Sequence, residues 1–234
     1  SSKFSRLDFL RFSALGASTL FIPRALTAAE APKKAKKGDV NDKINIGFIG
    51  LGQQAIHLVN GFLTIPEVRV IAGCDIYDIK RNRFIERVNK YYSEKGIKNK
   101  LDMYIKYEEL LAREDIDAVV IATPDHWHAA IAIAACKAGK DVYLEKPLTF
   151  TVYEGQRLIE AVRANNRILQ VGSMQRSMAE FIHAANVVRE GKLGKISTIY
   201  AYAGEGPLPY TLETTAAPAG LDWERWVGPL PAEW

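Results

Sequence analysis

The fold is decided by residues 44–55, which run INIGFIGLGQQA. The first six form a short apolar run that is typical of a buried parallel strand. Gly50-Leu51-Gly52-Gln53-Gln54-Ala55 then fits the G-x-G-x-x-G/A pattern of a strand-to-helix turn that binds a dinucleotide. Gly50 permits the tight turn and Gly52 lets the backbone approach a pyrophosphate, while Ala55 lets the helix pack closely on the strand. Amide groups at the start of that helix would donate to the phosphates.

Strand-like runs alternate with segments of helical spacing further along the chain. The other strand-like runs are short, β-branched and bounded by turn residues, and they cover residues 68–72, 118–121 and 141–144. Helical spacing covers about residues 55–63, 79–95, 128–138 and 152–165. Because such alternation implies right-handed βαβ units, we predict an α/β fold with an N-terminal, doubly wound parallel sheet of the Rossmann type.

An acidic residue follows the second strand-like run. Asp75 lies 20 residues beyond Ala55, where a carboxylate can bind the adenosine ribose hydroxyls of a dinucleotide. This carboxylate would repel a 2′-phosphate, so the predicted cofactor is NAD, with NADP less favoured. NADP stays open because Arg81 and Arg83 follow, although the start of a surface helix accounts for both.

Polar motifs follow the last two strand-like runs. Thr123-Pro124-Asp125-His126-Trp127-His128 comes after one and Glu145-Lys146-Pro147 after the other, at the strand ends where open α/β sheets bind ligands. No metal site is predicted, because His126 and His128 diverge at a helix start and no third ligand lies nearby. An ammonium held between a glutamate and a proline, as Lys146 is, can polarise a carbonyl or stabilise an alkoxide.

Charge and length limit the partners and the domains. The 234 residues carry 31 Lys/Arg and 27 Asp/Glu, a formal net charge of +4. Residues 1–43 hold nine of the basic and four of the acidic side chains. The rest of the chain therefore holds 22 basic and 23 acidic side chains. Residues 44–234 are therefore almost neutral and carry no basic stripe, so nucleic acid is not an expected partner. The length fits one large domain, or one complete domain and part of another.

The N-terminal segment has the order of an export signal. Basic residues are followed by an apolar run at 12–22 and by small residues at 27–29. Residues 5–11, SRLDFLR, are similar to a twin-arginine motif in which Leu7 replaces the second arginine. We predict a signal at 1–29 and a Lys-rich linker at 30–43. An amphipathic N-terminal helix is the alternative.

The predicted location is periplasmic, with a cytoplasmic location as the alternative. No stable membrane anchor is expected, because the apolar run has about half of the roughly 20 residues that cross a bilayer. Cys74 ends an apolar run and Cys136 lies in an Ala-rich helical stretch. Both are predicted to be buried free thiols.

Several motifs together resemble those of the Gfo/Idh/MocA oxidoreductases, over about residues 44–234. They are Gly50-Leu51-Gly52, Thr123-Pro124-Asp125-His126-Trp127-His128, Ala138-Gly139-Lys140-Asp141-Val142, Glu145-Lys146-Pro147-Leu148 and Gln170-Val171-Gly172. Leu221-Asp222-Trp223-Glu224-Arg225-Trp226-Val227-Gly228-Pro229 further resembles a subgroup of exported bacterial members. The resemblance implies an NAD(P)-binding Rossmann domain at 44–168 and the start of an α+β substrate domain at 169–234.

The resemblance also implies roles for individual residues. Lys146 would be catalytic, contacting both the cofactor and the reacting hydroxyl. Asp125 stands where the family usually has Asn, and a carboxylate accepts but does not donate a hydrogen bond. The cofactor-binding residues expected from the glycine pattern and the resemblance are Gly50, Gly52, Gln53, Gln54, Asp75, Thr123, Pro124, His126, His128, Glu145, Lys146 and Gln175.

Family members usually carry an Asp and a His four residues apart on a helix of the second domain. After residue 176 the only histidine is His183, in a helix expected at 179–190, where a surface or packing role is favoured. We therefore expect a truncated substrate domain here. We also expect a homo-oligomer in the full-length form.

The implied activity is NAD(P)-dependent hydride transfer between nicotinamide and a secondary hydroxyl of a carbohydrate substrate: a sugar, polyol or glycoside. One alternative is a glycosidase that uses tightly bound NAD for transient oxidation and elimination. Such relatives tend to lose the lysine that is present here as Lys146. A non-catalytic dinucleotide-binding module is the other alternative, because a fold alone does not give a function.

Overall fold

The computed structural model describes residues 43–202, 204, 206, 213 and 215–230. The predicted export signal at 1–29, and all but the last residue of the predicted linker at 30–43, lie outside the described residues. Among the helices that are described, none is both long and apolar enough to cross a membrane.

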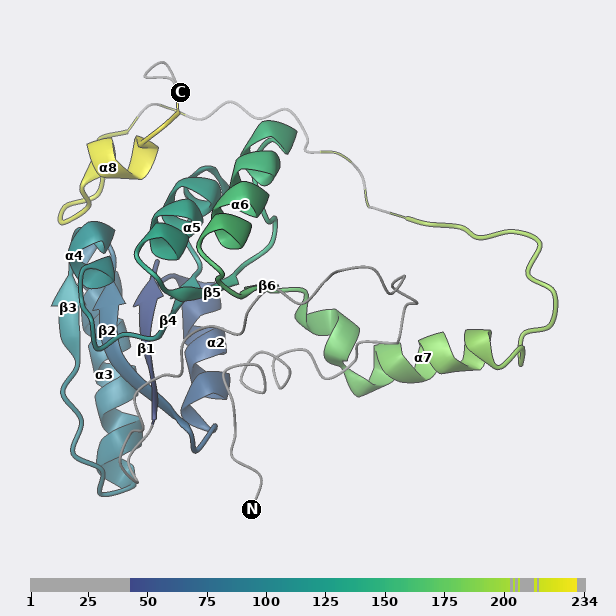
Figure 1. Ribbon diagram of the computed structural model, residues 1–234, viewed down its shortest axis with the longest axis horizontal. Coiled ribbons are helices and arrows are strands. Elements are labelled where there is room, and N and C mark those ends of the chain that lie inside the picture. The colour runs from purple at the N-terminus through teal and green to yellow at the C-terminus, as the bar shows by residue number, and fades with distance from the viewer. Residues whose placement is uncertain (1–42, 203, 205, 207–212, 214, 231–234) are drawn as a thin grey trace.

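One parallel sheet of six strands forms the centre of the molecule (Figure 1). The strand order is β3-β2-β1-β4-β5-β6, and every neighbouring pair is parallel. The order reverses at β1, so the predicted doubly wound α/β sheet is confirmed. The strands are β1 (Ile44–Ile49), β2 (Val68–Cys74), β3 (Asp102–Tyr104), β4 (Ala118–Ile121), β5 (Asp141–Leu144) and β6 (Leu169–Val171).

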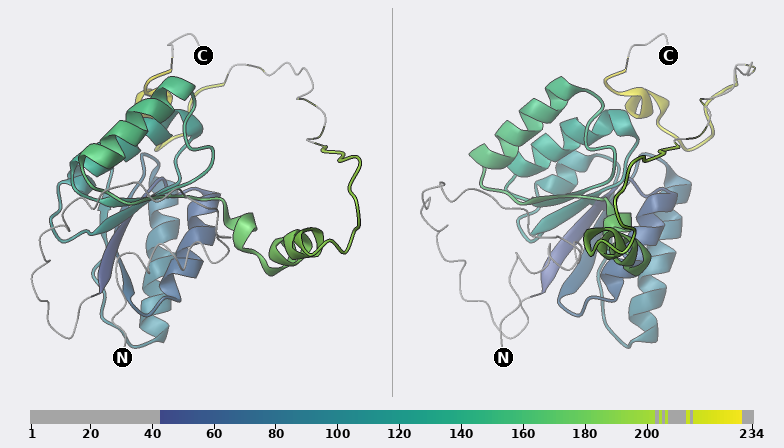
Figure 2. Two further views of the ribbon diagram at one scale, coloured as in Figure 1. Left: turned by 45° about the vertical axis from the view of Figure 1, so that its right-hand side comes forward. Right: turned by 90° about the vertical axis from the view of Figure 1, so that its right-hand side faces the viewer.

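Helices cover both faces of the sheet (Figure 2). One face packs against α2 (Gln53–Leu63) and α3 (Asp78–Glu94). There the ring centroid of Phe48 lies 5.8 Å from that of Phe62 and 5.2 Å from that of Phe84. The other face packs against α4 (Tyr107–Leu111), α5 (His128–Lys137) and α6 (Val152–Ala164). Both sheet faces are thus buried, which explains why the strands carry continuous apolar runs.

Within the sheet and the helices that cover it, the sequence patterns located α2, α3, α5, α6 and the four inner strands, but not β3, β6 or α4. Each of the two missed strands has three half-buried residues at a sheet edge. Such short strands contain no apolar run that a sequence pattern could detect. The boundary predicted at residue 168 falls just before β6, which belongs to the same sheet.

After β6 the chain leaves the sheet through the short helix η2 (Met174–Ser177) and then forms α7 (Ala179–Arg189). This helix matches the one predicted at 179–190, and none of its residues is buried. The chain later returns to the nucleotide-binding domain and forms α8 (Trp223–Val227) beside it (Figure 1). Tyr77 and Leu221 form an antiparallel bridge at this contact.

Both cysteines are buried free thiols, as predicted. Burial, followed by the negative charge of Asp75, raises the pKa of Cys74 to about 12. Burial likewise raises the pKa of Cys136 to about 11.

Because only the thiolate is nucleophilic, we expect iodoacetamide at about pH 8 to leave both thiols intact in the folded protein. Unfolding in guanidinium should expose both, and mass spectrometry would then count two added groups. Fast alkylation of either cysteine before unfolding would contradict the burial of that thiol.

Candidate functional site

The turn between β1 and α2 has the geometry that its glycine pattern predicts. Gly50 has a φ of +81°, and a Cβ there would lie 2.7 Å from the backbone of Ala122 and Thr123. Gly52 is the N-cap of α2 without a side-chain cap, and a Cβ on it would meet no described atom within 4 Å. The first N–H groups of α2 therefore lie beside open space, an arrangement that suits a phosphate.

Asp75 ties this turn to the end of β2. Its Oδ2 accepts a hydrogen bond from the Leu51 N–H at 2.6 Å, and its Oδ1 accepts one from the Tyr77 N–H at 2.9 Å. Arg81 and Arg83 lie on α3, as expected, and they donate to the carbonyl oxygens of Asp75 and Leu51 at 2.6 and 3.0 Å. The carboxylate is thus held rigidly, and each oxygen keeps a lone pair for a ligand.

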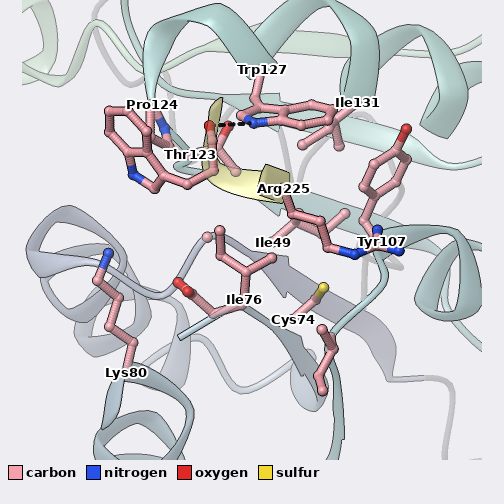
Figure 3. A pocket seen from close by; sticks show the side chains of 14 residues that line it. Ile49, Cys74, Ile76, Lys80, Tyr107, Thr123, Pro124, Trp127, Ile131 and Arg225 are labelled. Atoms are coloured by element: carbon pink, nitrogen blue, oxygen red, sulfur yellow. Dashed lines mark hydrogen bonds between the residues drawn. The ribbon is translucent and has the colours of Figure 1, made fainter. Parts of the chain in front are cut away.

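A cavity, called here the Asp75 cavity, opens beside this carboxylate (Figure 3). Its lining is mainly apolar: Ile49, Gly50, Cys74, Asp75, Ile76, Lys80, Ile105, Tyr107, Thr123, Pro124, Trp127, Ile131, Arg225 and Trp226. The Oγ1 of Thr123 is buried and has no hydrogen-bond partner among the described residues. Apolar walls suit the faces of an adenine ring, and a carboxylate with an unpaired hydroxyl suits a ribose. The residues present therefore fit the adenosine half of a dinucleotide.

A second cavity, the Lys146 cavity, lies beside the E-K-P motif. It is lined by Gln54, Glu145, Lys146, Gly172, Ser173, Met174, Gln175, Arg176 and Met178. Glu145 is 3% exposed, and its two carboxylate oxygens accept hydrogen bonds from Gln54 Nε2 at 2.9 Å and from the Lys146 N–H at 3.1 Å. The buried Glu145 thus fixes the backbone of Lys146, while the lysine itself is exposed.

Tyr143 and Gly172 complete the packing around Glu145. A Cβ on Gly172 would lie 2.7 Å from Glu145 Oε1 and 3.1 Å from the Tyr143 hydroxyl. Burial and, after it, the charge of Glu145 raise the pKa of Tyr143 to about 12. The phenol therefore stays protonated at neutral pH, and only glycine fits between it and the carboxylate.

The glycine turn lies between the two cavities. Gly50 lines the Asp75 cavity, and Gln54, four residues later, lines the Lys146 cavity. A dinucleotide with its adenosine beside Asp75 could therefore cross the start of α2 and bring its other end toward Lys146.

The structure gives two predicted site histidines backbone partners. His126, in the short helix η1 (Asp125–Trp127), has its Nε2 2.8 Å from the carbonyl oxygen of Trp226. His128 is 1% exposed, and its Nδ1 and Nε2 lie 2.6 and 3.0 Å from the carbonyl oxygens of Pro147 and Thr123. Neither histidine lines either cavity. His128 instead joins the turn after β4 to the turn after β5.

Most of the other predicted site residues line one of the two cavities. Gly50, Asp75, Thr123 and Pro124 line the Asp75 cavity, and Gln54, Glu145, Lys146 and Gln175 line the Lys146 cavity. Gly52 and Gln53 start α2 between them. In the part of the chain that is described, no group of three or more His, Cys, Asp and Glu side chains is arranged to hold a metal.

Three residues that line the Asp75 cavity were not among the predicted site residues: Trp127, Arg225 and Trp226. The sequence did contain a signal for a site role, because all three residues lie in motifs that carried the family resemblance. A sequence pattern could not bring Trp226 to His126, however, since the two are 100 residues apart. Their contact is a tertiary one.

Comparison with known proteins identifies the family. Residues 44–173 match the model of the Gfo/Idh/MocA oxidoreductase family, described as having an NAD-binding Rossmann fold. An α-N-acetylgalactosaminidase of Shewanella oneidensis is 32% identical over 155 residues, which are 65% of this chain and 33% of that protein. The chain spans less than half the length of the curated relatives that it matches.

Two solved structures share the fold. A scyllo-inositol dehydrogenase from Lactobacillus casei, with bound NAD(H) and scyllo-inositol, superposes with a TM-score of 0.54 at 26% identity, over 65% of this chain and 42% of that one. A 3-ketoreductase from Actinomadura kijaniata, in complex with NADP and TDP-benzene, gives 0.56 at 27% identity, over 64% of this chain and 43% of that one.

The position of His128 predicts a loss of stability when it is truncated. His128→Ala removes a buried ring that lies between the carbonyl oxygens of Pro147 and Thr123 and leaves a cavity, so the free energy of unfolding should fall by about 2–4 kcal/mol. Urea unfolding would measure this loss. The exposed His183 on α7 provides the control, since His183→Ala should change the stability by less than about 0.5 kcal/mol. Equal effects of the two variants would contradict a buried cross-linking role for His128.

Proposed function

The chain belongs to the Gfo/Idh/MocA family of oxidoreductases, and from this premise we propose that it binds NAD and transfers hydride between nicotinamide and a secondary hydroxyl of a sugar or polyol. The observation that carries the proposal is the placement of the Asp75 cavity and the Lys146 cavity on the two sides of the glycine turn. The bound inositol in the Lactobacillus casei relative supports a polyol as the substrate class.

Asp75 is the reason for preferring NAD to NADP. Its carboxylate faces the cavity with both oxygens fixed by backbone N–H groups. It would accept hydrogen bonds from the adenosine ribose hydroxyls and repel a 2′-phosphate. Gly52 and the start of α2 would hold the pyrophosphate, since their backbone lies beside open space.

Lys146 is proposed as the residue that acts on the substrate oxygen. When bound, nicotinamide supplies the hydride acceptor or donor. The Lys146 ammonium would bind the reacting hydroxyl and stabilise the negative charge that develops on its oxygen as its proton passes to solvent. Glu145 and Gln54 restrict the lysine backbone, and Gln175 and Arg176 would supply polar contacts to the substrate from the other wall.

A glycosidase that oxidises its substrate only transiently is the second candidate. The α-N-acetylgalactosaminidase of Shewanella oneidensis, at 32% identity, favours it. Lys146 argues for the dehydrogenase, because the glycosidase relatives tend to lose this lysine. Both candidates begin with removal of a hydride from a sugar carbon, so they differ in their net products rather than in the first step.

Replacing the Asp75 carboxylate should change the selectivity between the two cofactors. Asp75→Asn keeps the size of the side chain but removes the charge that repels a 2′-phosphate. We expect the ratio of the Kd for NADP to the Kd for NAD to fall by about tenfold. Isothermal titration of both cofactors would measure this ratio. A loss of affinity that affects both cofactors equally cancels in the ratio. An unchanged ratio would remove Asp75 as the selectivity determinant.

The reaction itself is tested on protein expressed from its complete gene. A panel of sugars and polyols with NAD should yield NADH, followed by absorbance. Lys146→Ala should lower kcat/KM by at least about 100-fold, through loss of charge stabilisation in the transition state. The exposed Lys137 on α5 supplies the control, because Lys137→Ala should leave kcat/KM unchanged.

The same protein, assayed with p-nitrophenyl α-N-acetylgalactosaminide, separates the two candidates. Release of p-nitrophenol without net NADH would support the glycosidase and reject the dehydrogenase. Cofactor binding without turnover of any substrate would leave a non-catalytic binding module.

A further inference from the structure

The segment of residues 220–228 is attached to the nucleotide-binding domain beside Asp75. The Asp78 N–H donates to the Gly220 carbonyl oxygen at 3.3 Å, and the Asp222 N–H donates to the Ile76 carbonyl oxygen at 3.3 Å. Leu221 between them forms the bridge with Tyr77. The first end of the segment is therefore fixed to the turn that follows β2.

The second end of the segment is fixed to the turn that follows β4. The carbonyl oxygen of Trp226 accepts a hydrogen bond from Trp127 Nε1 at 3.1 Å and lies 2.8 Å from His126 Nε2. The rings of His126 and Trp226 meet edge to face, with their centroids 5.4 Å apart. Because β2 and β4 flank β1 in the sheet, the segment spans the Asp75 cavity from one strand end to the other.

Glycines at both ends make the close approach possible. Gly220 has a φ of +79° and Gly228 a φ of +54°, which other residues rarely adopt. A Cβ on Gly220 would collide with the Asp78 carboxylate, and one on Gly228 would collide with the Trp127 indole. The docking therefore depends on these two positions and not only on side-chain contacts.

Between the two ends, the segment places a cation in the cavity. Arg225 and Trp226 belong to the lining. Arg225 is held from behind by Asp222, whose two carboxylate oxygens lie 3.1 Å from the Arg225 backbone N and 3.2 Å from its Nε. Figure 3 shows the Arg225 side chain inside the cavity, between Trp127 on one side and Cys74 on the other, and directed toward Tyr107.

We propose that the 220–228 segment forms the outer wall of the adenosine site and that Arg225 is a cofactor-binding residue that packs against the adenine ring. This inference rests on the proposed binding of NAD. A planar guanidinium lies well on the π face of a purine, and the apolar walls at Ile49 and Ile76 suit the opposite face. The cofactor would thus be held by a segment that no glycine pattern includes.

Titration of NAD and of AMP into the purified chain tests this role of Arg225. Arg225→Ala should weaken both ligands by about tenfold and by the same factor, because AMP contains the half of NAD that Arg225 would contact. Arg225→Lys keeps the positive charge but loses the planar guanidinium, so it should bind both ligands more tightly than Arg225→Ala but more weakly than the unmodified chain. The matched control is Arg157→Ala, since Arg157 lies exposed on α6 and pairs with Glu160.

A second variant tests the docking by a substitution outside the residues that line the cavity. Gly228→Ala should weaken AMP and NAD at least as much as Arg225→Ala, because it displaces the whole segment from Trp127. Gly206→Ala, where a Cβ meets no described atom within 4 Å, is its control.

Thermal unfolding should leave the midpoint of Arg225→Ala within about one degree of the unmodified chain, which separates lost binding from lost folding.

Different outcomes separate the two proposals. Failure of the unmodified chain to bind either ligand would overturn the proposed function and this inference together. Binding by the unmodified chain with equal or higher affinity in Arg225→Ala would overturn the inference alone and leave the NAD site standing.

Discussion

The backbone of the turn at Gly50 passes directly against the backbone at Ala122 and Thr123, and the whole site depends on this contact. The Gly50 N–H donates to the Cys74 carbonyl oxygen at 2.8 Å, and the Ala122 N–H donates to the Ile49 carbonyl oxygen at 2.9 Å. Three strand ends are thereby held at one level. Any larger residue at position 50 would push β4 away, and Asp75 and Thr123 would no longer line one cavity.

Buried polar groups at this level act mainly on the backbone. Asp75 holds the N–H of Leu51, Glu145 holds the N–H of Lys146, and His128 lies between two carbonyl oxygens. The Asp75 and Glu145 carboxylates are thus hydrogen-bonded within the protein before any ligand arrives. Such pre-set loops lower the ordering cost of binding, because the turns do not rearrange when a cofactor enters. The exposed Lys146 differs, since only its backbone is fixed.

The sequence was sufficient where the determinants are local. The glycine turn, Asp75 and the E-K-P motif each follow a strand, so strand position alone places them at the same sheet edge. Local pattern was insufficient for His126 and His128, whose neighbours come from Trp226 and Pro147. A histidine beside a strand end looks the same in sequence whether it faces a ligand or a carbonyl. The edge strands β3 and β6 were missed for a related reason, since pairing with a neighbour defines them more than composition does.

The position of the 220–228 segment follows from the same geometry. In a doubly wound sheet the turns after β2 and β4 diverge on the two sides of β1, so the crevice between them is wide and open to solvent. Flat apolar rings bind weakly to an open crevice, because one face stays hydrated. A segment fixed at both turns by Gly220 and Gly228 covers that face without altering the sheet. Cofactor affinity can then be tuned through residues such as Arg225, while the glycine turn and Asp75 keep the geometry that the fold requires.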